Sequence, residues 1–256
     1  MIHETAIIHP NAQLADDVSI GPYSVIGDGV VIGRGTRIAA HVSIEGPTCI
    51  GAENEIFQFA SIGAKPQDKK YAGEPTELWI GDRNVIREGC TLNRGTQQDK
   101  GKTVIGNDNW IMAYVHIAHD CIVGNHTVFA NNATLAGHVE IRDYVTLGGF
   151  TLVHQFCVVG EYAFTGMGSA LSKDVPPYIM ANGAPAEPRG INSEGLRRRG
   201  FASETIQRIR DAYRLLYRQH LSMQEALATI EARHRDLNDI QRLVDFCRSS
   251  GRGVIR

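Results

Sequence analysis

The sequence lacks the features that mark secreted, membrane-spanning and nucleic-acid-binding proteins. No apolar stretch approaches the roughly 18–20 residues that a membrane span needs, and no basic segment followed by an apolar run opens the chain, as a secretory signal would. A formal net charge of −2 offers no basic surface for a phosphate backbone. We therefore expect a cytoplasmic protein without stable membrane insertion and without a nucleic-acid partner.

Cysteine is scarce, and its arrangement excludes two kinds of stabilised fold. The five cysteines are an odd number and no two are spaced as CxxC, so we expect neither a complete disulfide framework nor a zinc-ribbon site. Reduced, mostly buried thiols suit a reducing compartment. What remains is an ordinary globular composition, with 43% hydrophobic and 21% charged residues among 256, which is enough for a continuous core.

Aliphatic residues recur every six positions through most of the chain. The first series has eleven consecutive members: Ile2, Ile8, Leu14, Ile20, Ile26, Ile32, Ile38, Ile44, Ile50, Ile56 and Ile62. A later series, shifted by one, runs from Ile105 to Leu171 and is broken only at Phe129 and Thr165. A helix would need hits three and four residues apart, and a half-buried strand would need strict alternation, so neither explains the pattern.

A period of six predicts one short strand per hexad, with three hexads closing a triangular coil of about 18 residues. Stacked coils hydrogen-bond to one another and bury a column of aliphatic side chains. Corners between strands need residues that adopt a positive φ, where Gly or Asn costs least. The expected fold class is therefore mainly β, a left-handed parallel β-helix of hexapeptide repeats.

Two polar stretches interrupt the repeat. Residues 64–79 and 93–103 lack its aliphatic positions, and we expect both to be loops that leave the coil wall. Loops carried by a rigid scaffold often hold functional residues.

The repeat ends near residue 176, and a helical pattern follows. Helices are expected over 203–219, from a capping box at Ser222, and over 240–247. This divides the chain into a β-helix over 1–185 and an α-helical C-terminal domain over 186–256. The tail is expected to cap the open coil end, which would otherwise be an aggregation edge, or to pack on a neighbouring subunit.

Histidines gather where the coil geometry brings distant residues together. His119, Gly137 and Gln155 are spaced by 18, so they should stack in one column of adjacent coils. Three more histidines lie beside this column: His116, His138 and His154. Each alone would be an ordinary exposed corner residue, but four at one corner indicate a site. A neutral histidine there could act as a general base, with the Gly137 N–H facing a developing oxyanion.

The histidine cluster leaves two interpretations open at this point. Three histidines and a water would suit zinc, as in the carbonic anhydrases built on this fold. Alternatively one histidine is a base and the others bind substrate. Side chains at His116 and His119 should point in different directions on a coil, which favours the second interpretation.

Several motifs are more specific than the repeat. They are HIAHDC from His116, NNATLAGH from Asn131, HQF from His154, QDKKYAGEPT from Gln67, GDRNVIR from Gly81, NSEGLRRRG from Asn192 and RGVIR from Arg252. Together these segments resemble the UDP-N-acetylglucosamine O-acyltransferases that begin lipid A synthesis, and the resemblance covers the whole chain.

The resemblance implies a cytoplasmic homotrimer with active sites between subunits and without a metal or cofactor. The family transfers a 3-hydroxyacyl chain from acyl carrier protein to the 3-hydroxyl of UDP-N-acetylglucosamine. Carried over to this sequence, His119 is the general base and the Gly137 N–H the oxyanion donor. The resemblance also implies a set of substrate-binding residues: Gln67, Asp68, Lys70, His116, His138, His154, Gln155, Asn192, Glu194, Arg198 and Arg199.

Two positions depart from the family pattern. Asn93 stands where a histidine is common, which opens the choice between a 3-hydroxyl and a 3-amino acceptor. Met167 stands where some members have glycine at the far end of the acyl groove. Its bulk would close the groove early and select chains of roughly C10–C12, since each methylene in such a pocket discriminates by about 1–3 kcal/mol. The alternative is that Met167 merely fills the core.

Three other functions compete with this one. The related N-acyltransferase of the same pathway normally carries an extra N-terminal domain, and here the hexads begin at Ile2, so we expect no such domain. A zinc-dependent hydratase on this fold would contain stoichiometric metal. A purely structural β-helix would show regular Ser or Thr ladders and no convergent histidines.

Overall fold

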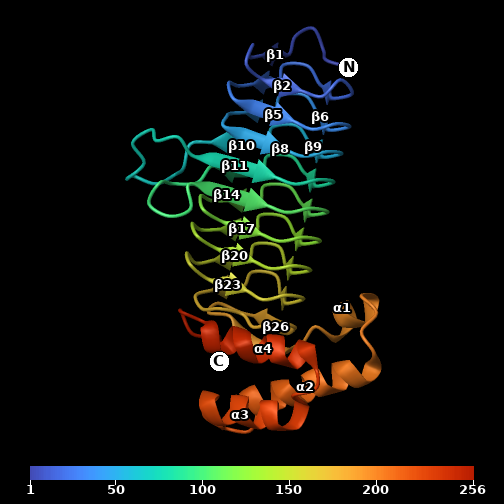
Figure 1. Cartoon of the computed structure of the whole chain (residues 1–256), viewed down its shortest axis with the longest axis vertical. Coiled ribbons are helices and arrows are strands. Elements are labelled where there is room, and N and C mark those ends of the chain that lie inside the picture. The colour runs from blue at the N-terminus through green and yellow to red at the C-terminus, as the bar shows by residue number, and fades with distance from the viewer.

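The chain winds into a left-handed parallel β-helix, and four helices cover one end of it (Figure 1). The computed structural model describes residues 1–256. The three faces of the triangular coil are three sheets, in which each strand pairs in parallel with the strand one coil away, except that the last strand of the third sheet is antiparallel. The predicted fold class is confirmed.

Each coil contributes one strand to each sheet. The first sheet contains β1 (Ile7–Ile8), β4 (Val25–Ile26), β7 (Ser43–Ile44), β10 (Ser61–Ala64), β13 (Thr91–Asn93), β16 (His116–Ile117), β19 (Thr134–Leu135), β22 (Leu152–Val153) and β25 (Ala170–Leu171). The second contains β2 (Gln13–Leu14), β5 (Val30–Ile32), β8 (Thr48–Ile50), β11 (Glu77–Ile80), β14 (Lys102–Ile105), β17 (Ile122–Val123), β20 (Glu140–Ile141) and β23 (Val158–Val159). The third contains β3 (Ser19–Ile20), β6 (Arg37–Ile38), β9 (Glu55–Ile56), β12 (Val85–Ile86), β15 (Trp110–Ile111), β18 (Val128–Phe129), β21 (Thr146–Leu147), β24 (Phe164–Thr165), β26 (Ile179–Asn182) and β27 (Glu187–Ile191).

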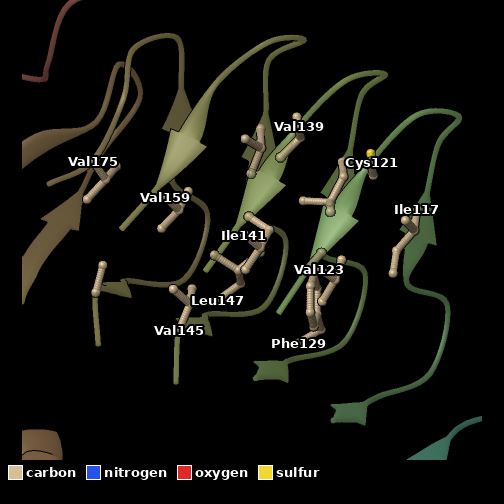
Figure 2. Close-up of a cluster of buried hydrophobic side chains, with 14 of the residues drawn as sticks. Ile117, Cys121, Val123, Phe129, Val139, Ile141, Val145, Leu147, Val159 and Val175 are labelled. Atoms are coloured by element: carbon tan, nitrogen blue, oxygen red, sulfur yellow. The ribbon is translucent and has the colours of Figure 1, made fainter. Parts of the chain in front are cut away.

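The aliphatic member of each hexad points into the coil. Ile117 pairs with Leu135 and Leu135 with Val153, so residues 18 apart lie directly over one another, and Figure 2 shows such side chains filling the interior. The two exceptions also fit inside. Phe129 is fully buried, and the hydroxyl of buried Thr165 accepts a hydrogen bond from the Gly148 N–H.

Some corners hold the expected Gly or Asn, such as Gly35 and Asn132, but many others do not. Many residues with positive φ are aromatic, and their rings stack from one coil to the next, as in His126–Tyr144 at 4.9 Å and Tyr144–Tyr162 at 4.8 Å between ring centroids. A left-handed residue costs about 1–2 kcal/mol, and an aromatic pair returns about 0.5–1.5 kcal/mol. Ring stacking therefore offsets much of the backbone cost.

The tail forms α1 (Ser193–Arg198), α2 (Ser203–Tyr217), α3 (Met223–His234) and α4 (Asn238–Ser249). The three expected helices are present, and α1 was not predicted. β27 runs antiparallel to β26 and extends the third sheet beyond residue 185, where the helical domain was expected to begin. None of the helices combines the length and apolar character that a bilayer crossing requires.

One end of the β-helix is covered by the C-terminal tail, and the other end is open. At the C-terminal end, α4 lies across the last coils (Figure 1) and the Ile255 N–H donates to the Asp174 carbonyl at 2.9 Å. At the N-terminal end no element covers the first coil, and Ile2 is 47% exposed. The tail therefore caps the end of its own chain's β-helix, one of the two roles predicted for it.

The predicted capping box at Ser222 is formed in full. The Glu225 N–H donates to Ser222 Oγ at 3.2 Å, and the Ser222 N–H donates to Glu225 Oε2 at 2.9 Å. We expect Ser222→Ala to lower the free energy of unfolding of the tail by about 1 kcal/mol, as measured by urea denaturation followed by circular dichroism at a helix-sensitive wavelength. Ser222→Thr keeps the hydroxyl and should keep the stability. Equal losses in both variants would contradict this role.

Candidate active site

Both loops and the stacked histidines lie at one corner of the coil, between the first and second sheets. Loop 65–76 joins β10 to β11, and loop 94–101 joins β13 to β14, one coil further on. His119 follows in the turn between β16 and β17, and the next two coils bring Gly137 and Gln155. We call this edge, from the two loops to Gln155, the histidine corner.

Gly137 lies directly against the ring of His119, as their spacing predicts. A Cβ added at Gly137 would stand 2.5 Å from Cε1 and 2.7 Å from Nε2 of His119, so no larger residue fits there without moving the ring. The Gly137 N–H donates to no acceptor within the chain. A free backbone donor therefore sits beside the imidazole, where it can bind a ligand oxygen.

Asp120 orients the ring of His119, a role that sequence reasoning did not assign. Asp120 has a φ of 59° and a fully buried side chain, and its Oδ2 accepts a hydrogen bond from His119 Nδ1 at 2.8 Å. With its proton on Nδ1, neutral His119 has its lone pair on Nε2, which has no partner in the chain. The only signal in the sequence was that Asp120 follows His119 directly.

Loop 94–101 holds this carboxylate in place. The Thr96 N–H lies 3.0 Å from each oxygen of Asp120, and the Thr96 hydroxyl donates to Oδ2 at 2.7 Å. Burial alone would raise the pKa of the Asp120 carboxyl, but the hydrogen bonds from His119 and Thr96 outweigh it and hold that pKa below its ordinary value. Asp120 is therefore ionised at neutral pH and stabilises a positive charge on His119.

His119, Asp120 and His138 also form the one acidic and imidazole cluster compact enough to consider for a metal, with candidate ligand atoms within 4.8 Å of one another. The donor set fits a metal poorly. Oδ2 of Asp120 already accepts from Thr96 and from His119, so an ion would have to displace bonds that are well formed.

His116 and His154 both lie on the first-sheet side of the column formed by His119 and Gly137, His116 in β16 and His154 directly after β22. His116 Nδ1 is 2.7 Å from the Thr91 hydroxyl; burial, and then the nearby His119, lower the pKa of His116, so this ring is neutral at neutral pH. Exposed His154 lines a groove of about 450 Å³ on the outer face of the first sheet. The groove is mostly apolar and is lined by Thr134, Ala136, Leu152, Val153, His154, Ala170, Leu171, Ser172 and Pro185.

Gln67, Asp68 and Lys70 project with loop 65–76 from the same corner, on the left in Figure 1. Gln67 and Lys70 are exposed, and Asp68 accepts a hydrogen bond from the Lys70 N–H at 2.9 Å. No hydrogen bond or ion pair joins them to the histidines of the same chain. Exposed Gln155 is likewise unpaired through its side chain, beyond Gly137 in the column.

The tail residues implied by the resemblance lie at another corner, between the second and third sheets: Asn192, Glu194, Arg198 and Arg199. The Asn192 side chain donates to the Tyr162 carbonyl at 2.9 Å, and the Arg199 guanidinium lies 4.8 Å from the Tyr144 ring centroid. Asn192 also caps α1 by accepting from the Gly195 N–H, and Glu194 pairs with Arg198. Within one chain, these side chains and His119 stand at different corners and do not form one site.

Met167 and Asn93 have well-defined surroundings. Met167 stands at the third corner, between β24 and β25, and is 78% exposed, so it is not core filler in this chain. Asn93 is buried, and its amide donates to the carbonyls of Ala64 and Lys65 at 3.2 and 2.8 Å. Asn93 thus fastens loop 65–76 to the coil.

A β-helix of hexapeptide repeats with clustered histidines, a free backbone donor and an apolar groove is typical of an acyltransferase of the hexapeptide-repeat class. Models of bacterial transferase hexapeptide repeats match residues 1–34, 11–46 and 102–137. The model described as UDP-N-acetylglucosamine O-acyltransferase, domain 2, matches residues 174–255.

Full-length relatives narrow the class. The chain is 57% identical over 255 residues to the acyl-[acyl-carrier-protein]–UDP-N-acetylglucosamine O-acyltransferase of Thiobacillus denitrificans, covering 100% of this chain and 99% of that one. It resembles the solved UDP-N-acetylglucosamine acyltransferases of Bacteroides fragilis (TM-score 0.98, 44% identity, 100% of both chains) and Moraxella catarrhalis (TM-score 0.96, 48% identity, 100% and 99%). The chain belongs to the family of acyl-[acyl-carrier-protein]–UDP-N-acetylglucosamine O-acyltransferases.

Proposed function

We propose that this acyltransferase moves a 3-hydroxyacyl chain from acyl carrier protein to the 3-hydroxyl of UDP-N-acetylglucosamine, the first step of lipid A synthesis. One observation carries the mechanism: His119 has Nδ1 bound to buried Asp120 and a free Nε2 beside the unpaired Gly137 N–H. A base and an oxyanion donor side by side are what acyl transfer requires.

The transfer follows from these two groups. His119 Nε2 takes the proton of the sugar hydroxyl as its oxygen attacks the thioester carbonyl, and the Gly137 N–H donates to the oxyanion that forms. When the intermediate collapses, the carbon–sulfur bond breaks and the His119 imidazolium returns its proton to the departing thiolate. Asp120 stabilises the transient imidazolium. Because a thioester is already an activated donor, no metal or cofactor is needed.

The active site is proposed to lie between subunits of a homotrimer. Four tail residues stand at a different corner from His119. They can reach a nucleotide bound at the histidine corner only from a second copy of the chain: Asn192, Glu194, Arg198 and Arg199. Two arginines suit a diphosphate. Large apolar side chains are also exposed along the third corner, and such a patch favours contact with another subunit. They are Tyr23, Phe59, Tyr114, Phe150 and Met167.

The remaining substrate contacts divide between the loop and the groove. Gln67, Asp68, Lys70, His116 and His138 surround the proposed sugar site at the histidine corner. His154 and Gln155 stand where the apolar groove reaches that corner, so the acyl chain would run from them along the outer face of the first sheet. Met167 would end that path three coils beyond the coil of His119, about 14 Å along the axis.

A transfer assay tests this function directly. We expect the purified protein to acylate UDP-N-acetylglucosamine faster than its 3-amino analogue, with 3-hydroxyacyl donors on acyl carrier protein. Because Asp120 is already engaged by Thr96 and His119, incubation with EDTA should leave the rate unchanged. Absence of transfer to either acceptor would refute the proposal. A rate lost on chelation and restored by zinc would refute the metal-free mechanism.

A further inference from the structure

Loop 94–101 contacts His138 and the backbone of Asp120, and the proposed chemistry assigns these contacts no role. Besides Thr96, which holds Asp120, the loop contributes Asp99, whose Oδ2 lies 2.7 Å from His138 Nδ1. Lys100 adds a hydrogen bond to the Asp120 carbonyl at 3.3 Å. Asp99 and His138 are 39 residues apart in sequence, so this contact fixes the loop against a coil two turns further along the β-helix.

The ring of His138 is held on several sides. Phe156 stacks on one face, with ring centroids 4.4 Å apart and planes 8° apart, and His119 meets it edge-on at 5.0 Å and 89°. Its side chain is only 15% exposed, and Oδ2 of Asp120 lies 4.0 Å from Nδ1, farther than Asp99. Stacking thus fixes the plane of the ring, and Asp99 is the group within hydrogen-bonding distance of Nδ1.

Two histidine–carboxylate pairs therefore lie side by side at this corner. His119 pairs with Asp120, and His138 pairs with Asp99. When Asp99 accepts from Nδ1–H, neutral His138 must present an Nε2 lone pair, because a neutral imidazole has one donor and one acceptor nitrogen. Nε2 of His138 has no partner in the chain and is left for substrate.

We propose that Asp99 is a positioning residue for the transfer reaction: it fixes the tautomer and the rotation of His138, so that Nε2 accepts a hydrogen bond from bound substrate. This inference rests on the proposed function and on the substrate-binding role proposed for His138. Lys100 is the other partner of Asp99, but at 3.6 Å and on a more exposed side chain it is the weaker competitor.

Kinetics of single and double variants test whether Asp99 acts through His138. Asp99→Asn is close in shape but can donate to Nδ1 and so stabilise the opposite tautomer. We expect it to lower kcat/KM about 10-fold, the scale found when a partner that orients a ligating histidine is removed. The double variant with His138→Ala should be no slower than His138→Ala alone. Asp99→Glu should recover part of the rate, and Gln98→Ala, in the same exposed loop, should change nothing.

Multiplicative losses in the double variant, or wild-type kinetics in Asp99→Asn, would overturn the proposal. A second measurement uses the unaltered protein: ¹⁵N spectra of histidine-labelled enzyme, at a pH where His138 is neutral, should show the proton on Nδ1. A proton on Nε2 would overturn it as well. If the wild-type enzyme transferred no acyl group at all, the proposed function would fail instead, and the tautomer would still be measurable.

Discussion

Replacing His119 with alanine is expected to lower kcat/KM by about 10³-fold, in the middle of the range for loss of a general base. The change removes the imidazole that lies against Gly137 and leaves the Gly137 N–H in place. The measurement is transfer from 3-hydroxyacyl carrier protein to UDP-N-acetylglucosamine under conditions of limiting acceptor. The acid limb of the pH–rate profile, which reports protonation of the base in the free enzyme, should disappear with the side chain.

The matched control is His126→Ala. His126, like His119, sits at a coil corner, but that corner lies between the second and third sheets, and its ring stacks on that of Tyr144. This variant should retain the wild-type rate. Near wild-type activity in a folded His119→Ala protein would show that another group is the base.

The second large effect concerns acyl-chain length. Met167→Gly should raise the use of C14 donors relative to C12 by roughly 30-fold or more, because two methylenes at about 1 kcal/mol or more each then find space. The side chain is 78% exposed in the single chain, so its bulk faces outward at the corner next to the groove. Competition between donors of different length on acyl carrier protein measures the ratio.

Met167→Leu separates bulk from the mere loss of methionine. Leucine keeps most of the volume, so the variant should keep the preference for roughly C10–C12. An unchanged C14 to C12 ratio in Met167→Gly, or an equal rise in both variants, would contradict the role of Met167 as a ruler.

Much of the fold could be predicted because the six-residue repeat also determines which residues pair between adjacent coils. Residues 18 apart pair wherever no insertion intervenes, as Ile117 and Leu135 do, so the position of Gly137 against His119 followed from counting. The insertions break this count. Ile62 pairs with Leu92, 30 residues away, and nothing in the repeat itself shows that both loops leave the same corner.

The polar contacts of the site were harder to predict. The contact between Asp120 and His119 involves a left-handed residue at Asp120, and Asp99 reaches His138 through the path of a loop without periodicity. Asn192 illustrates another difficulty: its side chain caps α1, a helix too short for its pattern to be recognised. Residues that arrange other residues leave weaker sequence signals than the repeat does.

The cover that the C-terminal tail gives to the last coils has a consequence for synthesis on the ribosome. The N-terminal coils leave the exit tunnel first, and each new coil needs only the one before it as a template. A partly made chain can therefore already form a shorter version of the finished β-helix. Its last coil then has an unpaired edge, which advances as translation proceeds. That growing edge is covered only after every coil has been made, since α4 and Ile255, which close it, follow the coils in the chain.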